Sequence, residues 1–121
     1  MIVLEGGRNK GEQLVRLIKM EFRYKTNTII IDSIGEAKFD KYLTEDDAQI
    51  IRVDKKRDPN DFITGFIESY DERFKNFDWV VFHLDAPEYM IDKFKALDRK
   101  YPQNFIITIH TDINKTSKWL M

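Results

Sequence analysis

The chain has 121 residues, 42% of them hydrophobic and 13% aromatic, which is enough for one globular domain with one core. Its formal net charge of −1 argues against a whole-surface attraction to nucleic acid or to an anionic membrane, although a local basic patch stays open as a minor alternative. The absence of cysteine excludes disulfides, zinc–thiolate sites and thiol catalysis.

Apolar runs and helical spacings alternate along the chain. In chain order we predict a strand over 1–5, a glycine-rich loop over 6–11, a helix over about 11–25, a strand over 28–31, a short helix over 36–43, a strand over 49–53 near a sheet edge, a helix over about 58–75, a strand over 79–84, a helix over 87–101 and a strand over 105–109. The short helix is predicted to face inward with Ala37, Phe39, Tyr42 and Leu43.

This alternation predicts an α/β fold, a three-layer sandwich with a mostly parallel sheet of about five strands. We expect a single domain over 1–121, with 114–121 as a possible tail. Right-handed crossovers place the carboxyl ends of parallel strands along one edge, where ligands of open α/β sheets bind. That edge is expected to carry the glycine-rich loop, Asp32, Asp85 and residues 110–112.

The glycine-rich loop is the first candidate for chemistry, because three of the five glycines lie in it. Its spacing fits G-x-x-x-x-G, the first half of the phosphate-binding P-loop pattern. The candidate nucleotide- or phosphate-binding residues are Gly6, Gly7, Arg8, Asn9, Lys10 and Gly11. Arg8 and Lys10 are candidates to replace the missing P-loop lysine, and ordinary solvated loop charges are the alternative.

The second half of the pattern is missing, since Glu12 and Gln13 stand where it requires Lys and then Ser or Thr. A carboxylate at the junction of loop and helix can occupy the anion site itself, because the helix dipole attracts it. The alternative is that Glu12 faces solvent. If Glu12 occupies the anion site, we expect weak or absent nucleotide binding.

Asp85 follows a buried strand, which is the Walker B arrangement for holding the magnesium of a nucleotide. The alternative is that Asp85 caps the helix that begins near Pro87. Glu88 is displaced from the position beside the Walker B acid, which is Ala86 here, and the helix dipole explains it.

The two histidines have different expected roles. His83 lies inside a buried strand, which favours a hydrogen-bonded core imidazole. His110 ends a strand near Asp112, so it joins Asp85 as a catalytic, metal-binding or phosphate-sensing candidate. No nucleophile, base and orienting acid occur at a recognisable spacing, and no catalytic residue is assigned.

Together these elements resemble the P-loop NTPases. The segment Ile29–Glu36, in which an apolar strand ends in Asp32 and Gly35-Glu36 follows, is similar to the second strand of DNA-pumping ATPases of the HerA/FtsK kind, in the additional-strand class. The resemblance implies that the strand ending at His110 lies between the glycine-loop strand and the Walker-B-like strand. The missing lysine, hydroxyl and catalytic acid imply a degenerate Walker A loop in a nucleotide-binding fold.

We therefore expect a non-catalytic or weakly nucleotide-binding P-loop-like domain that acts as a protein-interaction or regulatory subunit, with a phage or mobile element as its source. One alternative is a nucleotide-binding protein or weak NTPase that uses Lys10 for phosphate, Asp85 for magnesium, and ATP or GTP. Another is a doubly wound domain for a different small anion. We expect a protein partner or self-association. No apolar run spans a bilayer and no signal segment opens the chain, so we expect a cytoplasmic protein without a membrane partner.

Overall fold

The computed structural model describes residues 1–5, 9–21, 27–53, 65, 68–69 and 74–110. The strands are β1 Ile2–Glu5, β2 Thr28–Asp32, β3 Gln49–Arg52, β4 Trp79–Pro87 and β5 Asn104–His110. The helical elements are α1 Lys10–Arg16, the π-helix η1 Leu17–Glu21, α2 Ala37–Tyr42, the 3₁₀-helix η2 Glu88–Met90 and α5 Ile91–Lys100. None of these helices is long and apolar enough to cross a membrane.

The five strands form one sheet in the order β1-β5-β4-β2-β3, and every neighbouring pair is parallel. The predicted α/β fold with a mostly parallel sheet is therefore confirmed. β3 lies at one edge, as its more polar sequence indicated, and β1 lies at the other. β5 lies between β1 and β4, which is the position that the resemblance implies for the strand ending at His110.

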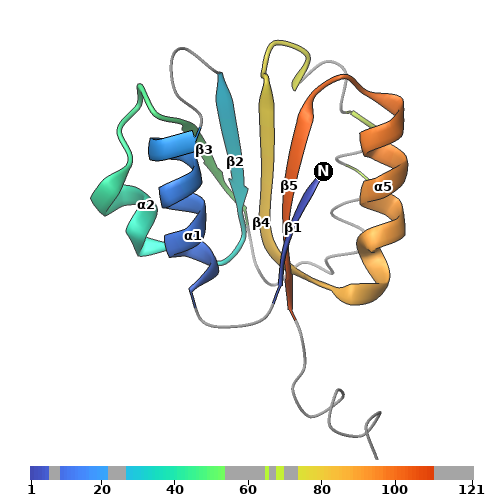
Figure 1. Ribbon diagram of the computed structural model, residues 1–121, viewed down its shortest axis with the longest axis horizontal. Coiled ribbons are helices and arrows are strands. Elements are labelled where there is room, and N and C mark those ends of the chain that lie inside the picture. The colour runs from blue at the N-terminus through green and yellow to red at the C-terminus, as the bar shows by residue number, and fades with distance from the viewer. Residues whose placement is uncertain (6–8, 22–26, 54–64, 66–67, 70–73, 111–121) are drawn as a thin grey trace, which may run out of the picture.

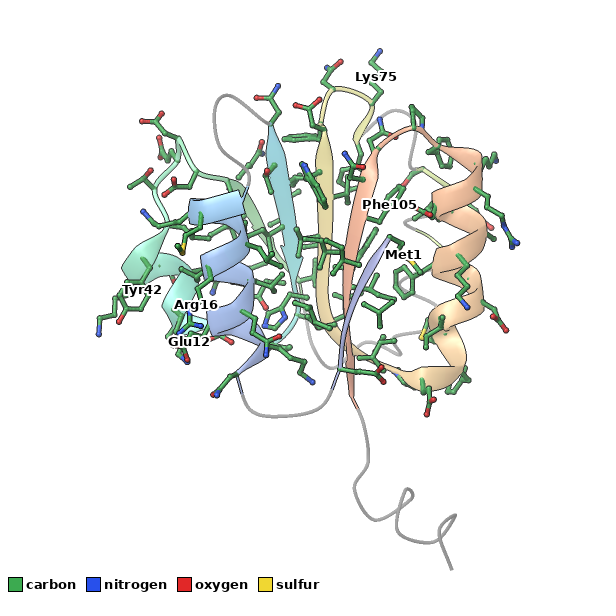
Figure 2. All side chains as sticks on the ribbon, in the orientation of Figure 1. Met1, Glu12, Arg16, Tyr42, Lys75 and Phe105 are labelled. Atoms are coloured by element: carbon green, nitrogen blue, oxygen red, sulfur yellow. The ribbon has the colours of Figure 1, made fainter. Side chains whose placement is uncertain are left out.

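Helices cover both faces of the sheet, with α1 and α2 on one face and α5 on the other (Figure 1). Because successive strand residues point to opposite faces, Ile30 packs toward α1 and α2, while Ile29 and Ile31 belong to the core cluster on the α5 side. Phe105 lies between β5 and α5 (Figure 2). Each such fully buried side chain contributes about 1.5–3 kcal/mol, so the two clusters hold the three layers together.

The predicted helices agree with the structure in position and differ in detail. α1 continues into η1 and so covers most of the expected helix, while residues 22–26 lie outside the described part. Phe39 in α2 is fully buried, and so is most of Leu43, the residue after the helix. Tyr42, in contrast, is 47% exposed, and Ala37 is exposed. Their predicted inward orientation is wrong because a six-residue helix presents only one narrow face to the sheet.

The end of β4 was also predicted incorrectly. The strand was expected to stop before Asp85, but it continues to Pro87. The helix predicted over 87–101 does follow, as η2 and then α5 from Glu88 to Lys100. The pairing with β5 shifts register between Phe82 and Ala86, so Ala86 and Pro87 pair with Ile109 and His110. Such a bulge re-aims the chain without ending the strand, and an apolar pattern does not reveal it.

Two further expected segments fall mainly or wholly outside the described residues. The helix over 58–75 is described only at a few positions, of which Phe74 is helical and fully buried. The possible tail over 114–121 also lies outside the described part.

The turn before β3 supplies a pH-dependent contribution to stability. The carboxylate of Asp47 accepts a hydrogen bond from the Thr44 backbone N–H at 2.8 Å and pairs with Lys19 Nζ at 3.2 Å. The Thr44 amide first, and then Lys19, hold the pKa of Asp47 below its usual value. Because this carboxyl group is more acidic when folded, its contribution is present at neutral pH and is lost as the pH falls below about 4.

We therefore expect Asp47→Ala to lower the free energy of unfolding at pH 7 by about 1 kcal/mol, the usual net value of such hydrogen bonds. Urea unfolding at pH 7 and pH 3 should show that the difference from the unsubstituted chain shrinks at pH 3. Asp46→Ala is the control, because Asp46 is exposed in the same turn and should change stability by less than about 0.5 kcal/mol at either pH. An equal effect of Asp47→Ala at both pH values would contradict this.

Candidate functional site

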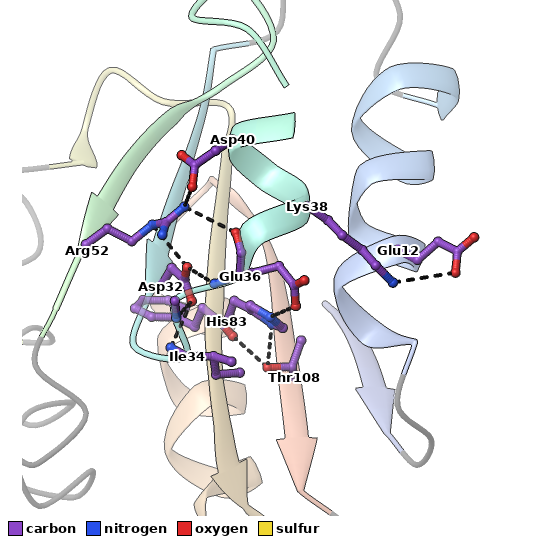
Figure 3. A network of polar contacts seen from close by, with 11 residues as sticks. Glu12, Asp32, Ile34, Glu36, Lys38, Asp40, Arg52, His83 and Thr108 are labelled. Atoms are coloured by element: carbon purple, nitrogen blue, oxygen red, sulfur yellow. Dashed lines mark hydrogen bonds and ion pairs between the residues drawn. The ribbon is translucent and has the colours of Figure 1, made fainter. Parts of the chain in front are cut away.

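At the carboxyl ends of the neighbouring strands β2 and β4, the chain leaves the sheet toward opposite faces. The helix after β2, α2, lies on the α1 side of the sheet, whereas the helix after β4, α5, lies on the opposite side (Figure 1). Neighbouring strands whose connections leave toward opposite faces form a topological switch point, where open α/β sheets bind ligands. The described polar side chains of this edge gather there (Figure 3).

Asp32 is the centre of the first contact group and is fully buried. Its Oδ1 accepts hydrogen bonds from the backbone N–H groups of Ile34 at 2.9 Å and Gly35 at 3.1 Å, and its Oδ2 accepts one from Glu36 at 2.8 Å. Gly35 has a positive φ of 78°, which lets the chain turn tightly around the carboxylate. Asp32 thus shapes the turn between β2 and α2.

Arg52, at the end of β3, pairs with the same carboxylate. Its Nε lies 3.1 Å from Asp32 Oδ2, and its second terminal nitrogen lies 3.1 Å from Asp40 Oδ2 on α2 and donates to the Glu36 carbonyl at 3.3 Å. With three amides and a guanidinium around it, the Asp32 carboxylate has its lone pairs satisfied. A metal ion or a ligand would have to displace these contacts to bind there.

His83 is the centre of the second contact group. The ring is buried, as the sequence predicted, and lies edge-on to Phe39 with centroids 5.2 Å apart. Its Nδ1 lies 3.2 Å from Thr108 Oγ1, and its Nε2 lies 3.4 Å from Glu36 Oε2. An ionised Glu36 can only accept, so Nε2 carries a hydrogen in that arrangement. The pair therefore ties α2 to the middle of the sheet.

Thr108, His83 and Glu36 follow the hydroxyl, imidazole and carboxylate order of a hydrolytic triad. Thr108 is fully buried inside β5, however, and its hydroxyl also lies 3.5 Å from the Phe82 carbonyl. A nucleophile must reach its substrate, and this hydroxyl has no exposed surface. The chain of contacts is therefore structural.

Glu36 also reaches the glycine-rich loop. Gly11 is buried at the start of α1, and a Cβ atom placed on it would collide with the carboxylate of Glu36. Gly11 is thus needed for this close approach, which gives the last glycine of the G-x-x-x-x-G spacing a reason inside the fold. The carboxylate beside the start of α1 belongs to Glu36 and comes from a segment 25 residues away in sequence.

The other loop candidates lie as follows. Lys10 is the first residue of α1, is buried, and donates from Nζ to the Ile109 carbonyl at 3.0 Å. Asn9 precedes the helix, is exposed, and accepts from the Gln13 N–H through its carbonyl at 2.9 Å. Gly6, Gly7 and Arg8 lie outside the described residues.

Glu12 faces outward from α1 (Figure 2). Its carboxylate lies 3.6 Å from Arg16 on the same helix and 3.8 Å from Lys38 on α2. Of the two arrangements considered for Glu12, the structure has the one in which it faces solvent. The ion pairs at this exposed position contribute little to stability.

The metal and sensor candidates are only partly described. Asp85 lies within β4 and His110 ends β5, both at the carboxyl edge, but their side chains lie outside the described part of the structure. Asp112 lies outside it altogether. Among the described residues, no group of three or more His, Asp or Glu side chains is placed to hold a metal ion.

Sequence reasoning placed Asp32 at this edge and His83 in the core, but it did not predict the contacts of Glu36, Thr108 and Arg52. The available signals were local: a Gly-Glu pair after β2, and two polar residues, His83 and Thr108, inside the otherwise apolar runs 79–84 and 105–109. A buried polar residue needs a partner. Which residues meet depends on strand order and register, which the sequence pattern leaves open.

Comparison with known proteins identifies no relative of this chain. No protein-family model matches the chain, and neither the curated proteins nor the solved structures give a match. The resemblance to P-loop NTPases therefore stays a prediction from the sequence.

Proposed function

We propose that this chain is a P-loop-like domain that does not hydrolyse nucleotide and acts by binding protein, as a regulatory or assembly subunit. The observation that carries the proposal is the position of the Glu36 carboxylate. It lies against Gly11, at the start of α1, and is held there by the buried ring of His83. A phosphate approaching the same glycine would meet a carboxylate of like charge.

The contact of Lys10 supports the same conclusion. In a working P-loop the lysine ammonium binds the nucleotide phosphates. The Lys10 ammonium is instead buried and donates to the Ile109 carbonyl at the end of β5. Glu12 and Gln13 replace the lysine and hydroxyl residues that the pattern requires, so both the sequence and the local contacts favour a loop without hydrolytic activity.

A nucleotide-binding protein or weak NTPase remains the second candidate, and the strand order favours it. β5 lies between β1 and β4, so the carboxyl end of β1, the last part of β4 with Asp85 and the end of β5 at His110 belong to three adjacent strands. This candidate uses Lys10 for phosphate and Asp85 for magnesium. It requires Glu36 to move away from Gly11 when nucleotide binds.

Titration with nucleotide separates the two candidates. A ligand present at a hundred times its Kd stabilises a protein by about 2.7 kcal/mol, which for a domain of this size raises the melting temperature by roughly 10 °C. We expect no such shift with millimolar ATP or GTP and Mg²⁺, and no release of inorganic phosphate above the rate without protein. Mg²⁺ alone is the control for an effect of the cation.

Lys10→Ala and Asp85→Ala make the test specific. A shift of several degrees that disappears in both variants, or phosphate release that depends on Asp85, would overturn the proposal and support the second candidate. A shift that survives both substitutions would point to a different small-anion site and would also overturn the proposal.

A further inference from the structure

β1 is an apolar strand at the edge of the sheet. Among the described residues it pairs only with β5, so its outer row of backbone N–H and C=O groups has no strand partner there. Ile2, Val3 and Leu4 are each only partly buried. These three residues include no charge and no proline, which are usual protections of an edge strand, and the one charge in β1 is the exposed Glu5 at its carboxyl end.

Both core clusters end at this strand. Val3 packs against the cluster on the α5 side, and Ile2 and Leu4 pack against the cluster on the α1 side. β1 therefore presents apolar side chains on both faces of the sheet at once. A strand added beside it would continue both clusters.

The opposite edge of the sheet is different. β3 begins and ends with the exposed polar residues Gln49 and Arg52, and Arg52 is engaged by Asp32 and Asp40. A charged residue on an edge strand discourages pairing with another chain. β3 is thus polar at both of its ends, whereas β1 is polar only at its carboxyl end, at Glu5.

We propose that β1 pairs with β1 of a second copy of this chain, antiparallel and centred on Val3, so that two sheets join into one. The proposal rests on the proposed function, because it names the partner and the surface of a protein-binding domain. A two-fold axis through Val3 is the symmetry of the commonest homodimers, in which the same patch contacts itself.

The sequence of β1 fits this register. Around Val3, Ile2 lies opposite Leu4 of the second copy and Val3 lies opposite Val3 of the second copy, so apolar side chains meet apolar side chains at all three positions. Directly opposite residues of an antiparallel pair point to the same face. In this register the α1-side cluster of one copy therefore continues into the α1-side cluster of the other, and the α5-side clusters join in the same way.

Engineered cysteines test the register, since the chain has none of its own. Cα atoms of directly opposite residues are about 4.5–5.5 Å apart, within the range that a disulfide spans. We expect Val3→Cys to form a covalent dimer under mild oxidation, and a mixture of Ile2→Cys and Leu4→Cys to form the mixed dimer. Gln49→Cys, exposed on the β3 edge, is the matched control and should stay monomeric on a non-reducing gel.

Association without a cross-link is the second readout. We expect the apparent mass in solution to rise with concentration toward twice 14.5 kDa. Leu4→Lys should abolish this rise, whereas Ile50→Lys should retain it, because Ile50 packs against the same cluster from the other edge strand. Circular dichroism of both variants checks that they are folded, and if Leu4→Lys unfolds, the cysteine pairs decide the question.

The outcomes are distinguishable from those of the nucleotide test. A chain that stays monomeric at every concentration, or cross-links as readily through Gln49→Cys as through Val3→Cys, overturns the β1 dimer and leaves the absence of hydrolysis untouched. Dimerisation that Leu4→Lys does not weaken places the contact elsewhere and also overturns it. Nucleotide hydrolysis by a β1-paired dimer would overturn the proposed function alone.

Discussion

Replacing Asp32 with alanine is expected to lower the free energy of unfolding by about 3 kcal/mol, since it removes a fully buried carboxylate that accepts three part-buried backbone hydrogen bonds. The substitution removes the acceptor of three backbone N–H groups, those of Ile34, Gly35 and Glu36, together with the carboxylate that pairs with Arg52. The Arg52 side chain is 38% exposed, so water can solvate its charge, and the amides account for most of the loss. Loss of the turn should also release Glu36 from His83.

Urea unfolding measures the effect, with the midpoint read at an unchanged slope. The matched control is Asp40→Ala, because Asp40 pairs with the same Arg52 at the same distance of 3.1 Å but its side chain is 72% exposed. We expect this control to lose less than about 1 kcal/mol, as exposed ion pairs do. Equal losses in the two variants would show that the buried carboxylate does not organise the turn.

The sequence predicts the layers of this fold well, for a physical reason. A strand buried on both faces must be mostly apolar, and the runs at 28–31, 79–84 and 105–109, which are apolar except for Thr28, His83 and Thr108, form the central strands. The shorter, more polar run at 49–53 was correctly predicted to lie near an edge. Local composition reports burial, and burial decides the place of a strand in the sheet.

The candidate site is less predictable because it depends on contacts between distant segments. Glu36, His83 and Thr108 come from three elements, and they meet only because β2, β4 and β5 are neighbours in the sheet. The bulge in β4 is equally hidden, since it depends on pairing with β5. The sequence indicated which edge carries the polar residues but not which of them satisfy one another.

Gly11 shows how a motif can have two physical explanations. In the P-loop pattern the glycine lets the backbone approach a phosphate, whereas in this structure it makes room for the carboxylate of Glu36. Both explanations require glycine, so the spacing alone does not separate them. The two explanations make different predictions for the substitution Gly11→Ala.

Gly11→Ala is expected to destabilise the chain by about 1–2 kcal/mol, although alanine is favoured over glycine in a helix by up to about 1 kcal/mol. The added Cβ collides with the Glu36 side chain, which must move away from His83, and a hydrogen bond to a carboxylate contributes about 1.5–3 kcal/mol. In a chain that already carries Glu36→Ala the collision is gone. There Gly11→Ala should be neutral or stabilising, so the effect of the same substitution changes sign.

A double-mutant cycle measured by urea unfolding gives the coupling between the two positions, for which we expect about 2 kcal/mol. Gly65→Ala is the matched control, because Gly65 is helical and exposed and a Cβ there meets nothing within 4 Å. It should be neutral or stabilising in both backgrounds. If Gly11→Ala behaves like Gly65→Ala in the unsubstituted chain, Glu36 is not held against α1. The argument that its carboxylate keeps phosphate out of the loop would then fail.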